Sequence, residues 1–233
     1  MFEPRFLQVR ELCVAYGRSQ VLFDVTLAAP KRGAVAVLGR NGAGKTTLLK
    51  TIVGELTAGS GTIAMDRHDM TRMPTEHRIR LGLGYVPQEH AVFGQLTVRE
   101  NLEVAALLNR DRSPIDQVLA WFPKLGRHLG QPAGTLSGGE RKMLAIGRAI
   151  LSSPRLLLLD EPTEGVWSGI IEEIAERLRE LIKDIALVIV EQHLELALDL
   201  ADYAYVLDRG RVALEGHASA VRSHPKLLQL LAP

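Results

Sequence analysis

The first 30 residues alternate apolar and polar positions with a period of two, interrupted by one polar turn. The alternation covers residues 6–16 and 20–29, and Gly17-Arg18-Ser19 lies between them. A period of two places apolar side chains on one face of a strand, so these segments predict a β-hairpin with one buried face. Residues 203–216, which surround Arg209-Gly210, predict a second hairpin near the end of the chain.

Other segments are apolar without interruption, which is the pattern of strands covered on both faces. These runs are residues 34–38, 156–159 and 186–190, and a fourth strand is predicted to end before Pro87. Helical periodicity occupies the intervening segments. They are residues 47–53, 76–81, 98–108, 115–122, 143–151, 170–182 and 194–200, with one or two short helices in 218–231. Buried strands that alternate with helices predict an α/β fold with a parallel sheet.

The segment 89–135 is helical in texture and is punctuated by three prolines, at positions 114, 123 and 132. We therefore expect a small helical subdomain inserted into the α/β core. The predicted organisation has three parts. Residues 1–88 form an N-terminal β-subdomain and the first part of the core, residues 89–135 form the helical subdomain, and residues 136–233 complete the core and add the C-terminal helices.

A glycine-rich turn joins the first buried strand to the first helix. Its sequence is Gly39-Arg40-Asn41-Gly42-Ala43-Gly44-Lys45-Thr46. Glycines allow the backbone to fold into a nest of inward N–H groups, and the helix N-terminus adds its positive dipole end. An ordinary turn before a helix is the alternative, but the full G-x-x-x-x-G-K-T pattern in these flanks indicates a nucleoside triphosphate site.

Each side chain at the end of this loop has an expected role at a triphosphate. Lys45 is expected to reach the β- and γ-phosphates, Thr46 to ligate Mg²⁺, and Thr47 to lie near the α-phosphate. ATP and Mg²⁺ are therefore the expected cofactors.

Two carboxylates, Asp160 and Glu161, end the buried strand at 156–159. Ligands bind outside the carboxyl ends of strands in α/β sheets. We expect Asp160 to hold Mg²⁺ through water, and Glu161 to orient and deprotonate an attacking water. Carboxylates at strand ends are often only solvated caps, and the phosphate loop elsewhere in the chain favours the catalytic interpretation.

Three further positions have a functional interpretation only if a nucleotide binds nearby. Tyr16 ends a strand where its ring could stack on adenine, although a strand-end tyrosine is usually core or rim. Gln88 leaves the strand before Pro87 and is either a solvated loop residue or a ligand at the Mg²⁺ site. Ser137-Gly138-Gly139-Glu140 precedes a helix, where Ser137 is a good N-cap and the glycines leave N–H groups open to an anion. A second anion cradle makes sense if it serves a nucleotide held by another subunit.

Bulk properties exclude several classes of function. The formal net charge is +1, from 28 Lys and Arg against 27 Asp and Glu, so no nucleic-acid partner is indicated. The only cysteine, Cys13, cannot form an internal disulfide and fits a reducing compartment. The first ten residues lack the apolar core of a signal peptide, and the apolar runs are too short to span a bilayer. Any role at a membrane is expected to come through a partner.

In this order, the pieces resemble the ATP-binding cassette (ABC) ATPases along nearly the whole chain. The resemblance is carried by residues 39–46, Val86-Pro87-Gln88, Leu136-Ser137-Gly138-Gly139-Glu140 and residues 156–161. It implies a P-loop NTPase (RecA-like) core with an antiparallel β-subdomain and an inserted helical subdomain. It also implies ATP hydrolysis coupled to transport.

The resemblance further implies a head-to-tail dimer in which Ser137, Gly138 and Gly139 of one subunit grip the γ-phosphate bound to the other. Gln88 would connect the Mg²⁺ site with the helical subdomain, and that subdomain would dock a transmembrane permease. The protein would be peripheral, on the cytoplasmic face of the cell (inner) membrane, with a solute-binding protein as an indirect partner.

The motif details resemble two groups of importers. The segment 134–149 and Val190-Glu191-Gln192 are similar to the ATPases of branched-chain amino acid importers. The sequences of residues 38–42 and 160–165 are more similar to the ATPases of the related urea and amide importers. ATPases that export lipid or polysaccharide are also similar.

Two positions depart from the family pattern. The switch position, usually histidine, falls on Gln192 or on His193, depending on the register. The loop after Glu161 has Gly165-Val166-Trp167-Ser168, so Trp167 replaces an aspartate that usually crosses the dimer seam. Our hypothesis is that this subunit pairs with a different ATPase subunit and hydrolyses ATP poorly when alone.

Other classes of ATP-binding protein fit this sequence less well. ABC proteins of translation usually carry two cassettes, and those of DNA repair carry a long coiled-coil insertion, for which the helical segment is too short. A regulatory subunit that binds ATP without hydrolysing it is compatible with the altered switch and seam, but Glu161 argues against it.

Overall fold

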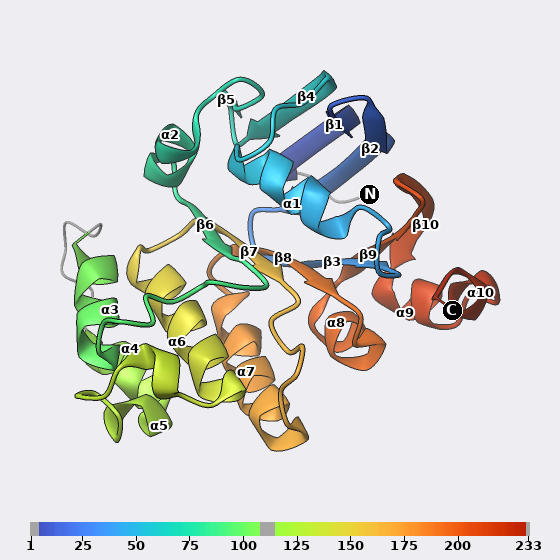
Figure 1. Cartoon of the computed structure of the whole chain (residues 1–233). Helices are drawn as coiled ribbons and strands as arrows, with labels where there is room; N and C mark the ends of the chain where they lie inside the picture. The colour runs from blue at the N-terminus through green and yellow to red at the C-terminus, as the bar shows by residue number, and fades with distance from the viewer. Residues whose placement is uncertain (1–4, 108–114, 232–233) are drawn as a thin grey trace.

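In the computed structural model, which describes residues 5–107 and 115–231, the centre of the fold is a six-stranded sheet (Figure 1). The strand order is β10-β9-β3-β8-β7-β6; all neighbours are parallel except β9 and β10, which form the predicted C-terminal hairpin. The strands are β3 (Gly33–Gly39), β6 (Leu83–Val86), β7 (Leu156–Asp160), β8 (Ala186–Glu191), β9 (Tyr203–Asp208) and β10 (Arg211–His217).

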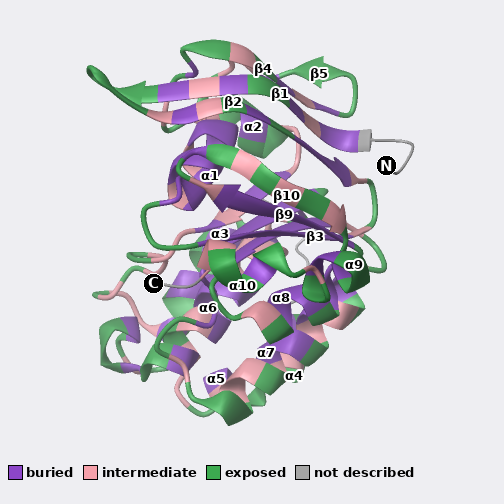
Figure 2. Cartoon of the chain, turned by 90° about the vertical axis from the view of Figure 1, so that its right-hand side faces the viewer, coloured by how far each residue is buried: buried purple, intermediate pink, exposed green. Residues whose placement is uncertain are grey.

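The continuous apolar runs are explained by burial on both faces of this sheet. Along β7, Leu156 and Leu158 belong to one hydrophobic cluster, and Leu157 and Leu159 belong to the other. Every residue of β7 and β8 is buried, whereas the edge strand β10 alternates exposed and half-buried residues, as its green and pink colouring in Figure 2 shows.

A second, antiparallel sheet lies above one face, with strand order β2-β1-β4-β5 (Figure 1). Its strands are β1 (Arg5–Tyr16), β2 (Ser19–Pro30), β4 (Ser60–Met65) and β5 (His68–Asp69). The predicted N-terminal hairpin is therefore confirmed. Helix α1 (Lys45–Val53) lies between the two sheets, and Leu48, Leu49 and Ile52 pack with both in one cluster.

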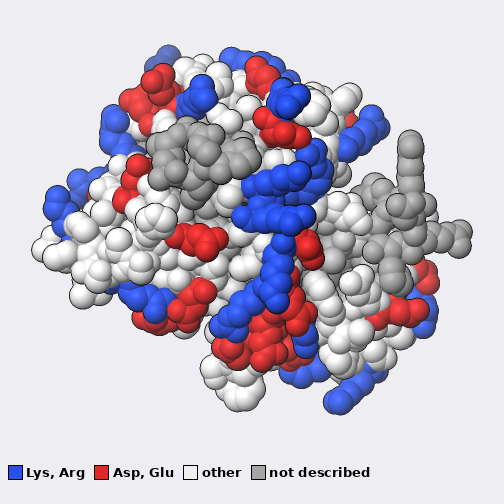
Figure 3. All heavy atoms as spheres, turned by 180° about the vertical axis from the view of Figure 1, so that it is seen from behind, with Lys and Arg blue, Asp and Glu red and all other residues white. Residues whose placement is uncertain are grey.

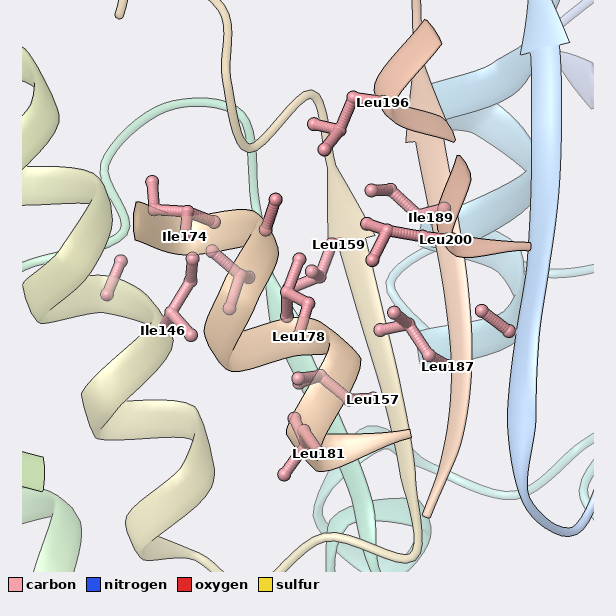
Figure 4. Packing of buried hydrophobic residues seen from close by; sticks show 14 of the residues in the cluster. Ile146, Leu157, Leu159, Ile174, Leu178, Leu181, Leu187, Ile189, Leu196 and Leu200 are labelled. Atoms are coloured by element: carbon pink, nitrogen blue, oxygen red, sulfur yellow. The ribbon is translucent and has the colours of Figure 1, made fainter. Parts of the chain in front are cut away.

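Three helices cover the opposite face: α6 (Gly138–Leu151), α7 (Ser168–Leu181) and α8 (Leu194–Leu200). Figure 4 shows Leu157, Leu159, Leu187 and Ile189 of the sheet directed toward Ile174, Leu178 and Leu181 of α7 and Leu196 and Leu200 of α8. The i, i+4 spacing of Ile174 and Leu178 puts these apolar residues on one side of α7.

The helical segment contains α3 (Val98–Ala106), α4 (Ile115–Trp121), α5 (Pro123–Gly126) and a 3₁₀ turn at Ala133–Thr135. Leu108, the predicted end of α3, lies outside the described residues. Pro123 was expected only to interrupt a helix, but it begins α5, because a helix tolerates proline in its first turn. These helices pack against α6, which also contacts β6 and α7. The boundary predicted at residue 135, between the helical subdomain and the rest of the core, therefore stays a prediction, because α6 begins after it and contacts both the helical subdomain and the core.

The remaining helices are peripheral: α2 (Thr75–Arg80), α9 (Ala218–Arg222) and α10 (Lys226–Leu231). On the rear face, Lys and Arg form a band with Asp and Glu beside it, in keeping with the near-neutral net charge (Figure 3). No helix within the described ranges has both the length and the apolar character to cross a bilayer.

Candidate functional site: a nucleotide site at the carboxyl edge of the sheet

The register of the central sheet brings the predicted motifs to one edge. Leu38 of β3 pairs with Glu191 of β8, and Asp160 of β7 pairs with Val190. Parallel strands end on the same side, so the glycine-rich loop after β3, the carboxylates after β7 and the residues after β8 must meet. Val86 of β6 pairs with Leu159, which adds the segment leading to Gln88.

The loop Gly39–Thr46 has the backbone shape of a phosphate nest. Gly42 and Gly44 have φ angles of 79° and 105°, and Gly44 is the N-cap of α1 without a capping side chain. The φ angle of Gly44 favours glycine, and a Cβ atom there would also approach Leu22 Cδ2 to 2.6 Å, so the leucine side chain would have to shift. The first turn of α1 has no acidic residue, which leaves its N–H groups and dipole open to an anion.

The β9–β10 turn supports this loop from a distant part of the sequence. Gly210 N–H donates to the carbonyl of Ala43 at 3.0 Å, and the Gly210 carbonyl accepts from Phe23 N–H at 2.8 Å. The loop is thereby fixed to β2 and to the C-terminal hairpin.

Lys45 is held within the loop. Its Nζ donates to the carbonyls of Gly39 at 2.8 Å and Arg40 at 3.1 Å, and its side chain is only 4% exposed. Thr47 is buried as well, whereas Arg40 and Asn41 are exposed at the rim. An ammonium fixed against a glycine nest is suited to binding phosphate oxygens.

Asp160 and Thr46 form a pair of oxygen donors. Thr46 Oγ1 donates to Asp160 Oδ1 at 3.3 Å, and Asp160 is fully buried. Burial raises the pKa of Asp160, and the Thr46 hydrogen bond opposes this shift. Within the described residues Asp160 Oδ2 makes no hydrogen bond of good geometry, and neither does the neighbouring Tyr85 hydroxyl. Burial, and then the Asp160 carboxylate, raise the pKa of Tyr85.

A buried carboxylate oxygen without a partner, beside a hydroxyl, fits a hard cation such as Mg²⁺. No group of three or more His, Cys, Asp or Glu in the described part of the chain is arranged to hold a metal. A Mg²⁺ ion here would accordingly draw further ligands from phosphate oxygens and water.

Glu161 is the centre of the polar contacts at this edge. Its side chain is almost fully buried, and three nitrogen atoms surround its carboxylate. They are Lys45 Nζ at 3.3 Å, Gln88 Nε2 at 3.1 Å and Gln192 Nε2 at 3.4 Å. The Glu161 backbone has a φ of 46°, a left-handed conformation that costs a non-glycine residue roughly 1–3 kcal/mol. Strained residues of this kind concentrate at functional sites.

The structure distinguishes the two candidates for the switch position. The Gln192 amide contacts both Glu161 and the Asn41 side chain of the loop. His193 instead occupies the N-cap position of α8 without a side-chain capping bond, and its backbone N–H donates to Glu191 Oε2 at 3.3 Å. The residue next to the Glu161 carboxylate is therefore Gln192, and a role of either residue in hydrolysis stays a prediction.

Three residues, Glu164, Glu191 and Lys142, make contacts that the sequence did not predict. Gln88 Nε2 also donates to Glu164 Oε2 at 2.8 Å, and the buried Glu191 accepts from Thr163 N–H and Oγ1 at 2.9 and 2.7 Å. Lys142 of α6 donates to the carbonyls of Gln88 and Glu161. Burial lowers the pKa of Lys142, and nearby carboxylates, Glu164 first, oppose that shift. No spacing rule in the sequence links a helix residue with two loop carbonyls.

Helix α6 begins at the predicted N-cap Ser137, and anion binding at this helix start stays a prediction. Ser137 Oγ accepts from Glu140 N–H at 3.3 Å, and Ser137 N–H and Oγ donate to Glu140 Oε2 at 3.0 and 2.7 Å. This capping box satisfies the predicted N-cap and uses the Glu140 carboxylate, so a nucleotide contact by Glu140 stays a prediction. Gly139 lies against Ile170, where a Cβ would come within 2.6 Å of its side chain.

Two aromatic residues remain open to solvent near these motifs. Tyr16 is 48% exposed at the end of β1, so its ring is available for stacking on a base. Trp167 is 74% exposed at the N-cap of α7, directly after the segment that carries Glu161 and Glu164.

A protein-family model described as "ABC transporter" matches residues 22–164, which include the loop, the capped start of α6 and both carboxylates. The chain belongs to the ABC transporter family. It is an ATP-binding subunit of the class that couples ATP hydrolysis to transport, as its sequence predicted.

Relatives within the ABC family match almost the whole chain. The chain is 41% identical to the high-affinity branched-chain amino acid transport ATP-binding protein BraG of Pseudomonas aeruginosa, covering 91% of this chain and 93% of BraG. It is 40% identical to the probable branched-chain amino acid transport ATP-binding protein LivF of Archaeoglobus fulgidus, covering 96% and 97%. It is 34% identical to the lipopolysaccharide export ATP-binding protein LptB of Escherichia coli, covering 90% of each.

Solved ABC cassettes have the same fold. The ADP conformation of MJ1267, an ATP-binding cassette of an ABC transporter, superposes with a TM-score of 0.87 at 26% identity, covering 97% of this chain and 98% of that chain. The predicted fold, a P-loop core with an antiparallel sheet and an inserted helical part, is confirmed.

Proposed function

We propose that this chain is the ATP-hydrolysing subunit of an ABC importer for branched-chain or other hydrophobic amino acids. The relatives at 41% and 40% identity support the cargo, since both are named for branched-chain amino acid transport and are covered almost end to end. The single observation that supports the chemistry is the convergence of Lys45, Gln88 and Gln192 on the buried Glu161 carboxylate.

Different residues bind the phosphates, hold the cation and act on the attacking water. The nest at 39–46 and Lys45 bind the β- and γ-phosphates, and Thr47 lies near the α-phosphate. Thr46, Asp160 and Gln88 would hold Mg²⁺, and the bound ion would offset phosphate charge. Glu161 orients a water and takes its proton as the water oxygen bonds to the γ-phosphorus and the bond to the ADP oxygen breaks.

A second subunit completes the site. Ser137, Gly138 and Gly139 present a helix N-terminus that serves the nucleotide of a companion ATPase subunit. The companion is a different chain, because Trp167 at the seam and Gln192 at the switch both depart from the pattern of the family. The isolated chain should accordingly turn over slowly.

The permease docks on an apolar groove beside the helical part. The groove has a volume of about 390 Å³, and its exposed apolar residues are Ile79, Phe93 and Val104. Phe93 stacks under the Arg148 guanidinium, whose carbon lies 4.4 Å from the ring centre. A short amphipathic helix of a membrane subunit fits such a surface. The chain is then peripheral, on the cytoplasmic face of the cell membrane, with a solute-binding protein as an indirect partner.

The decisive experiment isolates the transporter through a tag on this chain and identifies the co-purifying subunits and the bound solute. A branched-chain amino acid is the expected solute. Urea or a short amide would favour the related importers, and co-purification of a lipid or polysaccharide would favour export, which the LptB relative makes the second candidate.

The same complex tests the chemistry. Single-turnover hydrolysis of ATP should be fast with the natural chain and lost with Glu161→Gln. Equal rates for the two would instead indicate a regulatory subunit that binds ATP without hydrolysing it.

A further inference from the structure

Lys142 joins two segments that carry the candidate catalytic groups. Its Nζ donates to the backbone carbonyl of Gln88 at 3.0 Å and to that of Glu161 at 2.9 Å. Gln88 and Glu161 are 73 residues apart, and their side chains are themselves hydrogen-bonded at 3.1 Å. One ammonium thus fixes the backbones of both residues of this pair.

The contact with Glu161 is made at a strained turn. The Glu161 backbone has a φ of 46°, and its N–H donates to the carbonyl of Val190 at 2.9 Å. Lys142 holds the carbonyl on the other side of the same residue. A left-handed non-glycine residue persists only when its surroundings fix it, and here Val190 and Lys142 do so from opposite sides.

Lys142 is itself anchored on a rigid element. It is the fifth residue of α6, whose first turn is closed by the Ser137–Glu140 capping box. Further along the same helix, Arg148 Nη1 donates to the carbonyl of Ala91, in the segment that begins at Gln88. Helix α6 therefore carries the anion cradle at its start and holds the 88–91 segment at two points.

The chemistry of these contacts is unusual for a structural lysine. The residue is part-buried, and its ammonium donates hydrogen bonds to two neutral carbonyls. The charges of four carboxylates act on this ammonium, those of Glu164, Glu191, Asp160 and Glu161. An ion pair or an apolar residue would stabilise a part-buried helix face equally well. The Lys142 N–H donors instead bind the backbone carbonyls of Gln88 and Glu161, whose positions determine the direction of these two side chains.

We propose that Lys142 is a positioning residue for the ATPase reaction, and that it fixes the Glu161 turn and the Gln88 segment relative to the start of α6. This inference rests on the proposed function, since it assumes that Glu161 acts on the attacking water. Through Lys142, a shift of α6 on binding a nucleotide across the dimer seam moves both catalytic segments together.

The test compares Lys142→Met, which keeps the length and removes the donors, with Lys142→Arg, which keeps charge and donors. In the isolated transporter complex, Lys142→Met should lower kcat about tenfold to hundredfold, because small displacements of a catalytic group have effects of this size. The dissociation constant of the isolated chain for MgATP should change by less than about twofold, since the phosphate nest is untouched. Lys142→Arg should recover much of the rate.

Hydrogen exchange of the isolated chain gives a readout that does not depend on activity. Backbone amides in residues 86–92 and 159–165 should exchange faster in Lys142→Met than in the natural chain, and Lys142→Arg should lie near the natural chain. Lys183→Met is the matched control, because this exposed lysine follows α7 away from the site. It should leave the rate, the affinity and the exchange unchanged.

Two results would overturn the inference. One is a Lys142→Met complex that hydrolyses ATP within about twofold of the natural complex. The other is unchanged exchange in both segments. A natural complex that hydrolyses no faster than Glu161→Gln would refute the proposed function instead, and the exchange measurement would still decide whether Lys142 fixes the two segments.

Discussion

At the scale of single residues, the candidate site is a set of nitrogen atoms directed at one buried carboxylate. Glu161 is approached by Lys45, Gln88 and Gln192, while Asp160 beside it accepts a hydrogen bond from Thr46. The two carboxylates, adjacent in sequence, thus have separate surroundings. This separation allows one to act on water and the other to hold a cation.

Gln192 and His193 provide a direct test at this scale. Gln192→Ala removes an amide that lies 3.4 Å from Glu161 Oε1 and contacts the loop, so ATP hydrolysis by the complex should fall at least about tenfold. His193→Ala removes a side chain without a capping hydrogen bond and should cost less than about twofold. Steady-state kinetics on both variants measures this difference. The opposite order would return the switch role to His193.

At the scale of elements, the start of α6 depends on the Ser137–Glu140 capping box. The box orders the first turn, which must be fixed before its N–H groups can serve an anion. The Ser137 hydrogen bond, first among several causes, holds the pKa of Glu140 below its usual range.

This shift predicts a dependence of stability on pH. A carboxyl group with a lowered pKa in the folded state stabilises the protein above its unfolded pKa of about 4.3, and this stabilisation is lost as pH falls through the folded value. The natural chain should therefore be more stable than Glu140→Gln at pH 7, and the difference should vanish in acid. Urea unfolding between pH 7 and pH 3.5 measures it, with the exposed Glu176→Gln as control. A difference that is constant with pH would contradict the capping explanation.

At the scale of the whole molecule, an exposed tryptophan marks the proposed seam. Trp167 is 74% exposed, and the only other tryptophan, Trp121, is half-buried near the helical part. Large exposed aromatic residues are characteristic of protein interfaces.

Fluorescence can follow this residue during assembly. In a Trp121→Phe chain Trp167 is the one remaining tryptophan, and its share of the emission of a complex is the difference from the same complex carrying Trp167→Phe as well. Its emission should shift to shorter wavelengths when MgATP closes a complex that carries Glu161→Gln, because the indole leaves water. The isolated chain should show little shift with the same nucleotide. An unchanged spectrum in the complex would place Trp167 outside the seam.

The sequence predicted the elements well where local patterns determine them. The uninterrupted run at 156–159 indicated burial on both faces, and the glycines at 42 and 44 indicated the nest before α1. It could not place Lys142 against the Gln88 and Glu161 carbonyls, or Glu164 against Gln88, because these contacts depend on how α6 lies on the sheet. The choice between Gln192 and His193 likewise depended on where β8 ends, which periodicity places only to within a residue or two.

The hydrogen bond from Gly210 N–H to the Ala43 carbonyl has a consequence for synthesis of the protein. The nucleotide loop is translated before its neighbouring strand β9 and the supporting turn, and Gly210 follows Ala43 by 167 residues (210 − 43). The loop therefore remains without this support until Gly210 has been translated. A chain truncated before β9 should lose ATP binding even though every residue of the loop is present.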